Sequence, residues 1–306
     1  MFARCSICVI VFVFFAGSID AGAKAGKPIH PRPLDEIKKT LSTILTPDDK
    51  KADDNTKALR KLKAYRYLSG LAYEDLTLDD KYNQMCLAGA KLCEKIGKLE
   101  HTPKNPGLPE DEYKLGYKGT SQSNLAQGTL TLVESVDGWM DDSDEANIDR
   151  LGHRRWCLNP TMQKTGFGQS GEFTLMFSFD RNRKKVPDYD LICYPAPGYM
   201  PIEFFGINHA WSVTLNPKKY KTPAKGFEPK IFAADDMGMK KGEPLALNYR
   251  NVDATGFGIA NCIIFRPEKL ALTPRSRYVV ELEGIQPQAG TKATTLRYVV
   301  EFVNVK

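Results

Sequence analysis

The chain has 306 residues, of which 42% are hydrophobic and 26% are charged, and its formal net charge is +6. This length exceeds the ~100 to 200 residues of a typical domain, so we expect two domains. The composition excludes an intrinsically disordered chain. Basic residues are interspersed with acidic ones except in the cluster from Arg181 to Lys185. Because a nucleic-acid-binding protein needs a concentrated basic face, nucleic acid is not expected as a partner.

The N-terminus has the pattern of a secretory signal peptide, which we place at residues 1–23. Arg4 precedes an apolar run from Ile7 to Ala16, and small residues follow up to Ala23. The apolar run is too short to span a bilayer, and no later segment approaches the ~20 apolar residues of a transmembrane helix. The sequence therefore predicts a secreted protein, extracellular or periplasmic, with no transmembrane segment.

The cysteines do not form a dense disulfide framework. Cys5 and Cys8 lie in the predicted signal peptide. Residues 86 and 93 lie on one predicted helix, about 10 Å apart and beyond the ~7 Å Cα limit of a disulfide, so they cannot pair with each other. We interpret most of the remaining cysteines as buried small hydrophobic residues, although an oxidising compartment would permit up to two disulfides. The five cysteines of the mature chain are Cys86, Cys93, Cys157, Cys193 and Cys262.

Helical patterns fill the first half of the chain. Apolar residues at helical spacing predict helices at about 34–45, 59–69, 80–100 and 123–140. Pro47 ends the first of these helices, and Asp79 is the start signal of the third, which stops just before His101. A loop rich in Pro and Gly separates the third helix from the fourth.

Two shorter elements follow. A helix is predicted from Ser143 or Asp144, as its N-cap, to Leu151, and Gly152 would end it in a left-handed conformation. His153 would then lie just past a helix terminus. Alternating residues at 172–179 predict a half-buried strand. The basic cluster that follows it, Arg181, Arg183, Lys184 and Lys185, is interpreted as a hairpin tip that aids solubility, and contact with acidic envelope polymers is the alternative.

From about residue 195 the chain changes to short strands separated by Pro and Gly. We predict strands at 211–215, 230–234, 257–265, 277–283 and 296–303, and the last two belong to a β-sandwich. The predicted organisation is a signal peptide (1–23), an N-terminal leader and helix (24–52), a helix-rich domain (53–194) and a β-sandwich domain (195–306).

Several short motifs follow one another along the first two thirds of the chain. They are YRYLSGL (65–71), SNLAQG (123–128), VESVDGWMDD (133–142), LGHRRWCLNP (151–160) and GFG (166–168). Taken in order, they resemble the CAP superfamily of cysteine-rich secretory proteins, venom antigens and plant pathogenesis-related proteins. The match covers roughly residues 57–194 and is most similar to a bacterial-style branch with a His-Arg motif. The resemblance implies an α+β fold in which a CAP-like α-β-α sandwich, residues 53–194, precedes the C-terminal β-sandwich.

The resemblance also implies a functional cleft. Family members have two His and two acidic residues there, which in several members hold a divalent metal such as zinc. In this chain the two His are His101 and His153, and Asp142 takes the place of one acid. The other acid is missing, because Ser123-Asn124 stands where the family has Glu-Asn. We therefore expect Ser123 and Asn124 to line a degenerate zinc cleft.

The chemistry of this residue set limits what the cleft can do. Zinc takes about three or four N, O or S ligands, so His101 and His153 need Asp142 or water to complete a site. Without a second carboxylate, a hydrolase lacks an evident general base. Two residues have an alternative structural interpretation: Ser123 as the N-cap of the fourth helix, and Asp142 as a solvated acid.

Other polar residues near the cleft have two interpretations each. Arg154 and Trp156 either contact an anion or sugar beside the cleft, or pack to fix the turn, which we favour because Arg stems cover apolar surface. His30 and His209 have no matching partner and are interpreted as structural.

The sequence lacks a Gly-rich phosphate loop, an HExxH motif, a CxxC pair and a GxSxG elbow. We therefore predict a secreted CAP-domain protein that binds a lipid, sterol, polysaccharide or peptide, with weakly bound zinc as the one cofactor to consider. The alternatives are a metal-dependent hydrolase, a peptidase or esterase, that uses the His pair, and a structural envelope component. No catalytic residue is assigned.

Overall fold

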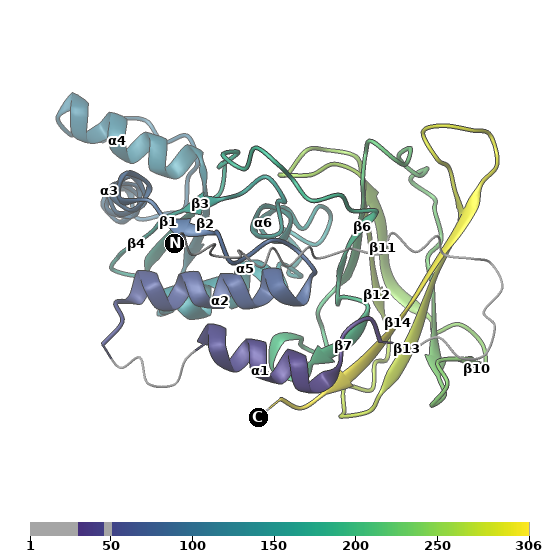
Figure 1. The fold of residues 1–306 in the computed structure, drawn as a ribbon. Helices are drawn as coiled ribbons and strands as arrows, with labels where there is room; N and C mark the ends of the chain where they lie inside the picture. The colour runs from purple at the N-terminus through teal and green to yellow at the C-terminus, as the bar shows by residue number, and fades with distance from the viewer. Residues whose placement is uncertain (1–29, 46–50, 306) are drawn as a thin grey trace, which may run out of the picture.

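The computed structural model describes residues 30–45 and 51–305 of the chain (Figure 1). The predicted signal peptide and the helix stop at Pro47 lie outside these residues. Over the described residues, no helix is long and apolar enough to cross a membrane.

Local capping signals set the starts of some of the helices. Asp79 caps the third helix by accepting hydrogen bonds from the backbone N–H groups of Lys81 and Tyr82, and Gly97 ends it in a left-handed conformation with φ 70°. The predicted helix at 34–45 is thus confirmed, and the helix predicted after Asp79 is confirmed but ends at Ile96, earlier than predicted. The helices are α1 (Leu34–Leu45), α2 (Asp54–Leu68), α3 (Asp80–Ile96), α4 (Glu110–Ser121), α5 (Leu132–Asp141) and α6 (Gly152–Cys157).

An antiparallel three-stranded sheet lies between the helices, in the order β2 (Ser123–Gln127), β5 (Phe173–Phe177), β4 (Phe167–Ser170). Leu175 and its neighbours on one face pack against α3, whereas Met176 on the other face packs with residues of α2 and α5. Figure 1 shows α3 and α4 on one side of this sheet and α2 on the other. The region is therefore an α-β-α sandwich. A short parallel pair, β1 (Thr77–Leu78) and β3 (Lys164–Thr165), lies beside it.

The structure corrects several local predictions. Residues 123–127 form strand β2 and not the start of a helix, so Ser123 is not an N-cap, and the helix α4 was not predicted. No helix spans 143–151: Leu151 has φ 48° and α6 begins at Gly152. Strand β5 is buried on both faces because helices cover both sides of the sheet. The basic cluster is not a hairpin tip, because β5 and the next strand along the chain belong to different sheets.

The C-terminal region contains two sheets. One has the order β10-β9-β13-β14-β7 and the other the order β11-β12-β8-β6. Trp211 packs against Phe265 of its own sheet and against Tyr278 and Phe302 of the facing sheet, so the two sheets enclose a common aromatic core. The strands are β6 (Leu191–Tyr194), β7 (Gly198–Pro201), β8 (Trp211–Leu215), β9 (Lys230–Ala234), β10 (Lys240–Lys241), β11 (Leu247–Asp253), β12 (Cys262–Pro267), β13 (Arg277–Ile285) and β14 (Thr294–Val303); a 3₁₀ turn spans Ile202–Phe204.

The predicted strands at 211–215 and 230–234 are confirmed, and the last two are each longer than predicted. The strand predicted at 257–265 begins later, at Cys262. Its first residues instead form a connection between β11 and β12, in which Gly258 and Asn261 have positive φ. An α+β domain followed by a β-rich region is thus the observed architecture.

Candidate functional site

A cavity of about 450 Å³ lies where the α-β-α sandwich meets the C-terminal region. This volume falls within the range of about 300 to 1,000 Å³ that is typical of small-molecule sites. Its lining comes from segments far apart in the sequence: the residues around His101, the end of α4 and start of β2, α6 with the turn before it, and the connections after β5 and after β11. The lining residues are His101, Ser121, Ser123, Asn124, Asn147, Arg150, Gly152, His153, Trp156, Phe179, Arg181, Gly256 and Phe257.

His153 is held in place by Asp142. The ring lies in the first turn of α6, and its Nδ1 donates a hydrogen bond of 2.8 Å to Oδ1 of Asp142. Asp142 ends α5 with φ 48° and is only 3% exposed. Its Oδ2 accepts the backbone N–H of Arg154 at 3.2 Å. Burial raises the pKa of this carboxyl above its ordinary value, and the hydrogen bond and charge of His153 oppose that shift.

His101 is held by a backbone acceptor. Its Nδ1 donates to the carbonyl oxygen of Thr120 at 2.8 Å, and the Thr120 hydroxyl donates back to the carbonyl of His101 at 3.1 Å. A carbonyl or carboxylate can only accept, so both His rings carry their proton on Nδ1. In both rings Nε2 is the nitrogen left for a ligand, and both rings line the same cavity.

The residues of the cavity do not complete a zinc centre. The two oxygens of Asp142 are engaged by His153 and Arg154, and Asp142 does not line the cavity. Within residues 30–45 and 51–305, no group of three or more His, Cys, Asp or Glu residues is placed to hold a metal ion. His101 and His153 would thus supply at most two of the about three or four ligands that zinc takes.

Ser123 and Asn124 lie at the start of β2 and line the cavity. The side-chain amide of Asn124 donates to the carbonyl oxygen of His153 at 3.0 Å, which ties β2 to α6. The Ser123 hydroxyl lies 3.6 Å from the thiol of Cys86.

Trp156 lines the cavity and stacks on Phe179 with ring centroids 4.2 Å apart. Phe179 follows β5 and is 43% exposed. The two rings form an aromatic wall.

Arg154 and Arg155 are buried and connect the two regions of the molecule. Arg154 donates to the carbonyls of Met140 and Ala210, both at 2.7 Å, and does not line the cavity. Arg155 pairs with Asp253 and donates to the carbonyl of Ile259 at 3.0 Å. These contacts hold the connection between β11 and β12 against α6, and thereby place Phe257 at the cavity.

Several lining residues had no sequence signal for a role at a site. Phe257 and Gly256 lie more than a hundred residues from His153, so no local spacing could indicate them. Arg181 was interpreted only as part of a solubilising cluster. Arg183 of that cluster is buried and pairs with Asp75, which explains why the segment folds back onto the α-β-α sandwich.

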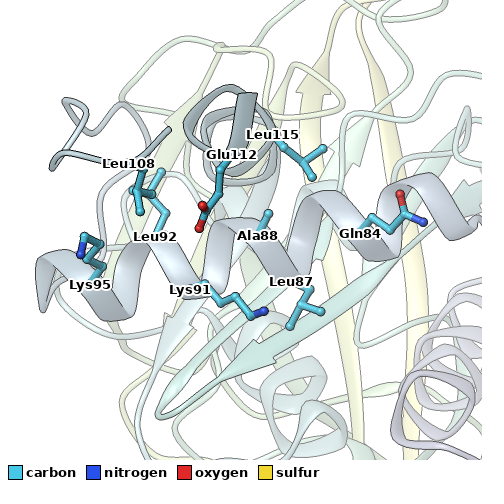
Figure 2. A pocket seen from close by; sticks show the side chains of 9 residues that line it. All are labelled: Gln84, Leu87, Ala88, Lys91, Leu92, Lys95, Leu108, Glu112 and Leu115. Carbon is cyan, nitrogen blue, oxygen red and sulfur yellow. The ribbon is translucent and has the colours of Figure 1, made fainter. Parts of the chain in front are cut away.

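A second hollow, of about 420 Å³, lies between α3 and α4 (Figure 2). Leucine side chains form much of its lining, and its charged groups are Lys91, Lys95 and Glu112. Unlike the first cavity, it is lined by no imidazole and no hydroxyl group of the described residues, so the first cavity is the candidate site.

The geometry agrees with the comparison to protein families. Residues 59–173 match the family model described as the cysteine-rich secretory protein family, CAP. Searches of curated proteins and of solved structures find no match to the chain. The matched range contains both cavity imidazoles and Asp142, whereas Phe179, Arg181 and Phe257 lie outside it. Residues 59–173 are therefore a CAP domain of the cysteine-rich secretory protein family.

Proposed function

We propose that the protein is a ligand-binding module and that its ligand enters the cavity that His101 and His153 line. The observation that carries this proposal is the matched anchoring of the two rings. Each Nδ1 is bound to a protein acceptor, so each ring is fixed with Nε2 as its remaining nitrogen, and both rings line the same cavity. A rigid pair of acceptors in a cavity of ligand size favours binding over a purely structural envelope role.

We further propose that the protein acts outside the cytoplasm after removal of residues 1–23, as the N-terminal pattern predicts. The C-terminal region would contribute to recognition, because Gly256 and Phe257 supply part of the cavity wall.

Zinc would be at most a weak partner of this site. Two imidazoles leave at least one coordination position to water or to a bound molecule. The hydrolase alternative has less support, because among the described residues no hydroxyl or thiol donates to either ring and no carboxylate lines the cavity as a general base.

Zinc binding tests whether the rings of His101 and His153 belong to one site. We expect calorimetry to show weak zinc binding that a His101→Ala/His153→Ala double variant loses and that weakens at acidic pH, because imidazole must be deprotonated to coordinate metal. His30→Ala is the control, since His30 pairs with Glu301 away from the cavity. Equal zinc binding by the double variant would show that the rings do not form one site, and zinc-dependent cleavage of a peptide or ester would favour the hydrolase.

A further inference from the structure

We propose that the ligand is an acidic carbohydrate, a sugar ring that carries a carboxylate or sulfate group. This inference rests on the proposed binding function and specifies its ligand. It is carried by three properties of the cavity: cationic side chains without lining carboxylates, an aromatic wall whose exposed ring is Phe179, and hydroxyl and amide groups in place of aliphatic side chains.

The charge of the lining is positive. Arg150 and Arg181 line the cavity together with the two imidazoles, and none of the described lining residues is Asp or Glu. Asp149 pairs with one nitrogen of Arg150 at 2.8 Å, while the other donates to Asn147. Arg181 is exposed and makes no ion pair with the described part of the chain. A guanidinium group matches the two oxygens of a carboxylate or sulfate, so an anion is favoured over a cation.

The apolar part of the lining is aromatic. Trp156 and Phe179 form one wall and Phe257 reaches the cavity from the C-terminal region. The C–H face of a sugar ring packs well on such rings. A lipid tail or sterol would require aliphatic walls, yet no Leu, Ile, Val or Met is found among the lining residues that the structure describes.

The remaining lining residues suit the hydroxyl groups of a sugar. The Ser121 hydroxyl donates to the carbonyl of Tyr117 at 2.7 Å and so retains its capacity to accept. Ser123 adds a further hydroxyl, whereas the side-chain amide of Asn147 is already engaged by Asp144 and Arg150. The Nε2 atoms of His101 and His153 accept hydrogen bonds from sugar hydroxyls. The cavity volume of about 450 Å³ suits one or two sugar rings better than an extended peptide.

The wall formed by Phe257 requires a glycine opposite to it. A Cβ at Gly152 would lie 3.0 Å from Cδ1 of Phe257, which is tighter than ordinary contact. Gly152 therefore lets the connection between β11 and β12 approach α6 closely. The choice of the sugar ring that binds then depends on both the α-β-α sandwich and the C-terminal region.

The test compares methyl β-glucuronide with methyl β-glucoside. The two sugars differ only at C6, which is a carboxylate in the glucuronide and a hydroxymethyl group in the glucoside. The full chain without residues 1–23 is titrated with each sugar, and binding is followed by ligand-observed saturation-transfer NMR. We expect the glucuronide to bind about tenfold more tightly, and its binding to weaken as salt is raised. N-acetylglutamate is the third probe, and we expect it to bind no better than the glucoside.

Matched variants connect binding to the cavity. Arg150→Gln and Arg181→Gln should each remove most of the preference for the glucuronide, whereas Lys184→Gln removes the same charge from the same segment outside the cavity lining and should leave it intact. Phe257→Ala should weaken both sugars. Thermal melting establishes that each variant is folded.

Each contrary outcome is distinct. Equal affinity for the two sugars would overturn the acidic character of the ligand and leave the binding function standing. Equal affinity for N-acetylglutamate and the glucuronide would favour an acidic peptide. Sugar binding that the arginine and histidine variants do not change would place the sugar elsewhere. If neither sugar binds while zinc still requires both imidazoles, the carbohydrate inference fails alone; if zinc does not require them either, both proposals fail.

Discussion

The carboxylate of Asp142 lies behind the ring of His153 and fixes it by a hydrogen bond of 2.8 Å, although the two residues belong to different helix ends. Asp142 is thus positioned as a support for an imidazole and does not line the cavity itself. Such a carboxylate orients the ring and keeps the proton on Nδ1.

Asp142→Ala should destabilise the protein by about 2 to 4 kcal/mol, because it leaves the Nδ1–H of His153 and the backbone N–H of Arg154 without acceptors. Chemical denaturation measures the change. The control is Asp188→Ala, which removes an exposed partner of Lys219 and should change stability by less than about 0.5 kcal/mol. Similar effects of the two substitutions would contradict a supporting role for Asp142.

His209 should make stability fall between about pH 6.5 and pH 4. Burial lowers the pKa of this imidazole from 6.5 to about 4, and the nearby charge of Asp141 only partly opposes the shift. In acid the unfolded chain therefore takes up the proton first, and up to about 3 kcal/mol is lost over this window, with no further loss below it. Denaturation at several pH values across this range gives the free energy of unfolding, which should vary less with pH for His209→Gln than for the unchanged protein. If the free energy of unfolding falls equally with pH in both proteins, His209 is not the cause of the acid destabilisation.

Gly119 should not tolerate a methyl group, whereas Gly138 should benefit from one. A Cβ at Gly119 would lie 2.0 Å from the carbonyl oxygen of Met85, where α4 crosses α3, and backbone atoms cannot move aside easily. We expect Gly119→Ala to cost about 1 to 3 kcal/mol or more. Gly138 is helical with nothing within 4 Å of the added atom, so Gly138→Ala should gain about 0.5 to 1 kcal/mol. Melting temperatures of the two variants should move in opposite directions.

The cysteines should be inert in the folded protein. Cys86, Cys93, Cys157, Cys193 and Cys262 are buried and free. Burial raises the pKa of Cys86 to about 12, so very little thiolate forms near neutral pH. We expect alkylation by iodoacetamide to be slow in native conditions and complete in denaturant, with reduction making no difference. Rapid labelling of the native protein would contradict the burial of these thiols.

Much of the fold could be predicted from the sequence where the signal is local. The helix after Asp79 and the strands at Trp211–Leu215 and Lys230–Ala234 have clear start signals or alternation. Strand β2 could not be predicted from the sequence, because Leu125 and Leu132 also fit a helical spacing. Only its pairing with β5 decides that this segment is a strand. Helix α4 was missed because Gly116 and Gly119 weaken the helical pattern. Those glycines are needed for close contact with α3.

The residues of the candidate site could be predicted where they lie in motifs that follow the order of the CAP family. His101, Ser123, Asn124, His153 and Trp156 do line one cavity. The roles of Asp142 and Arg154 depend on tertiary contacts, since both are buried behind the lining and bonded to other parts of the chain. No periodicity or spacing reveals such a contact before the chain is folded.

The connection between β11 and β12 has a consequence for how related proteins diverge. Arg155 clamps this connection against α6, whereas the two imidazoles are anchored by Asp142 and Thr120, which lie outside it. A substitution at Phe257 could therefore admit a different molecule without altering the CAP domain. Two chains with the same histidine pair could differ in what they recognise, and comparison of their CAP domains alone would miss the difference.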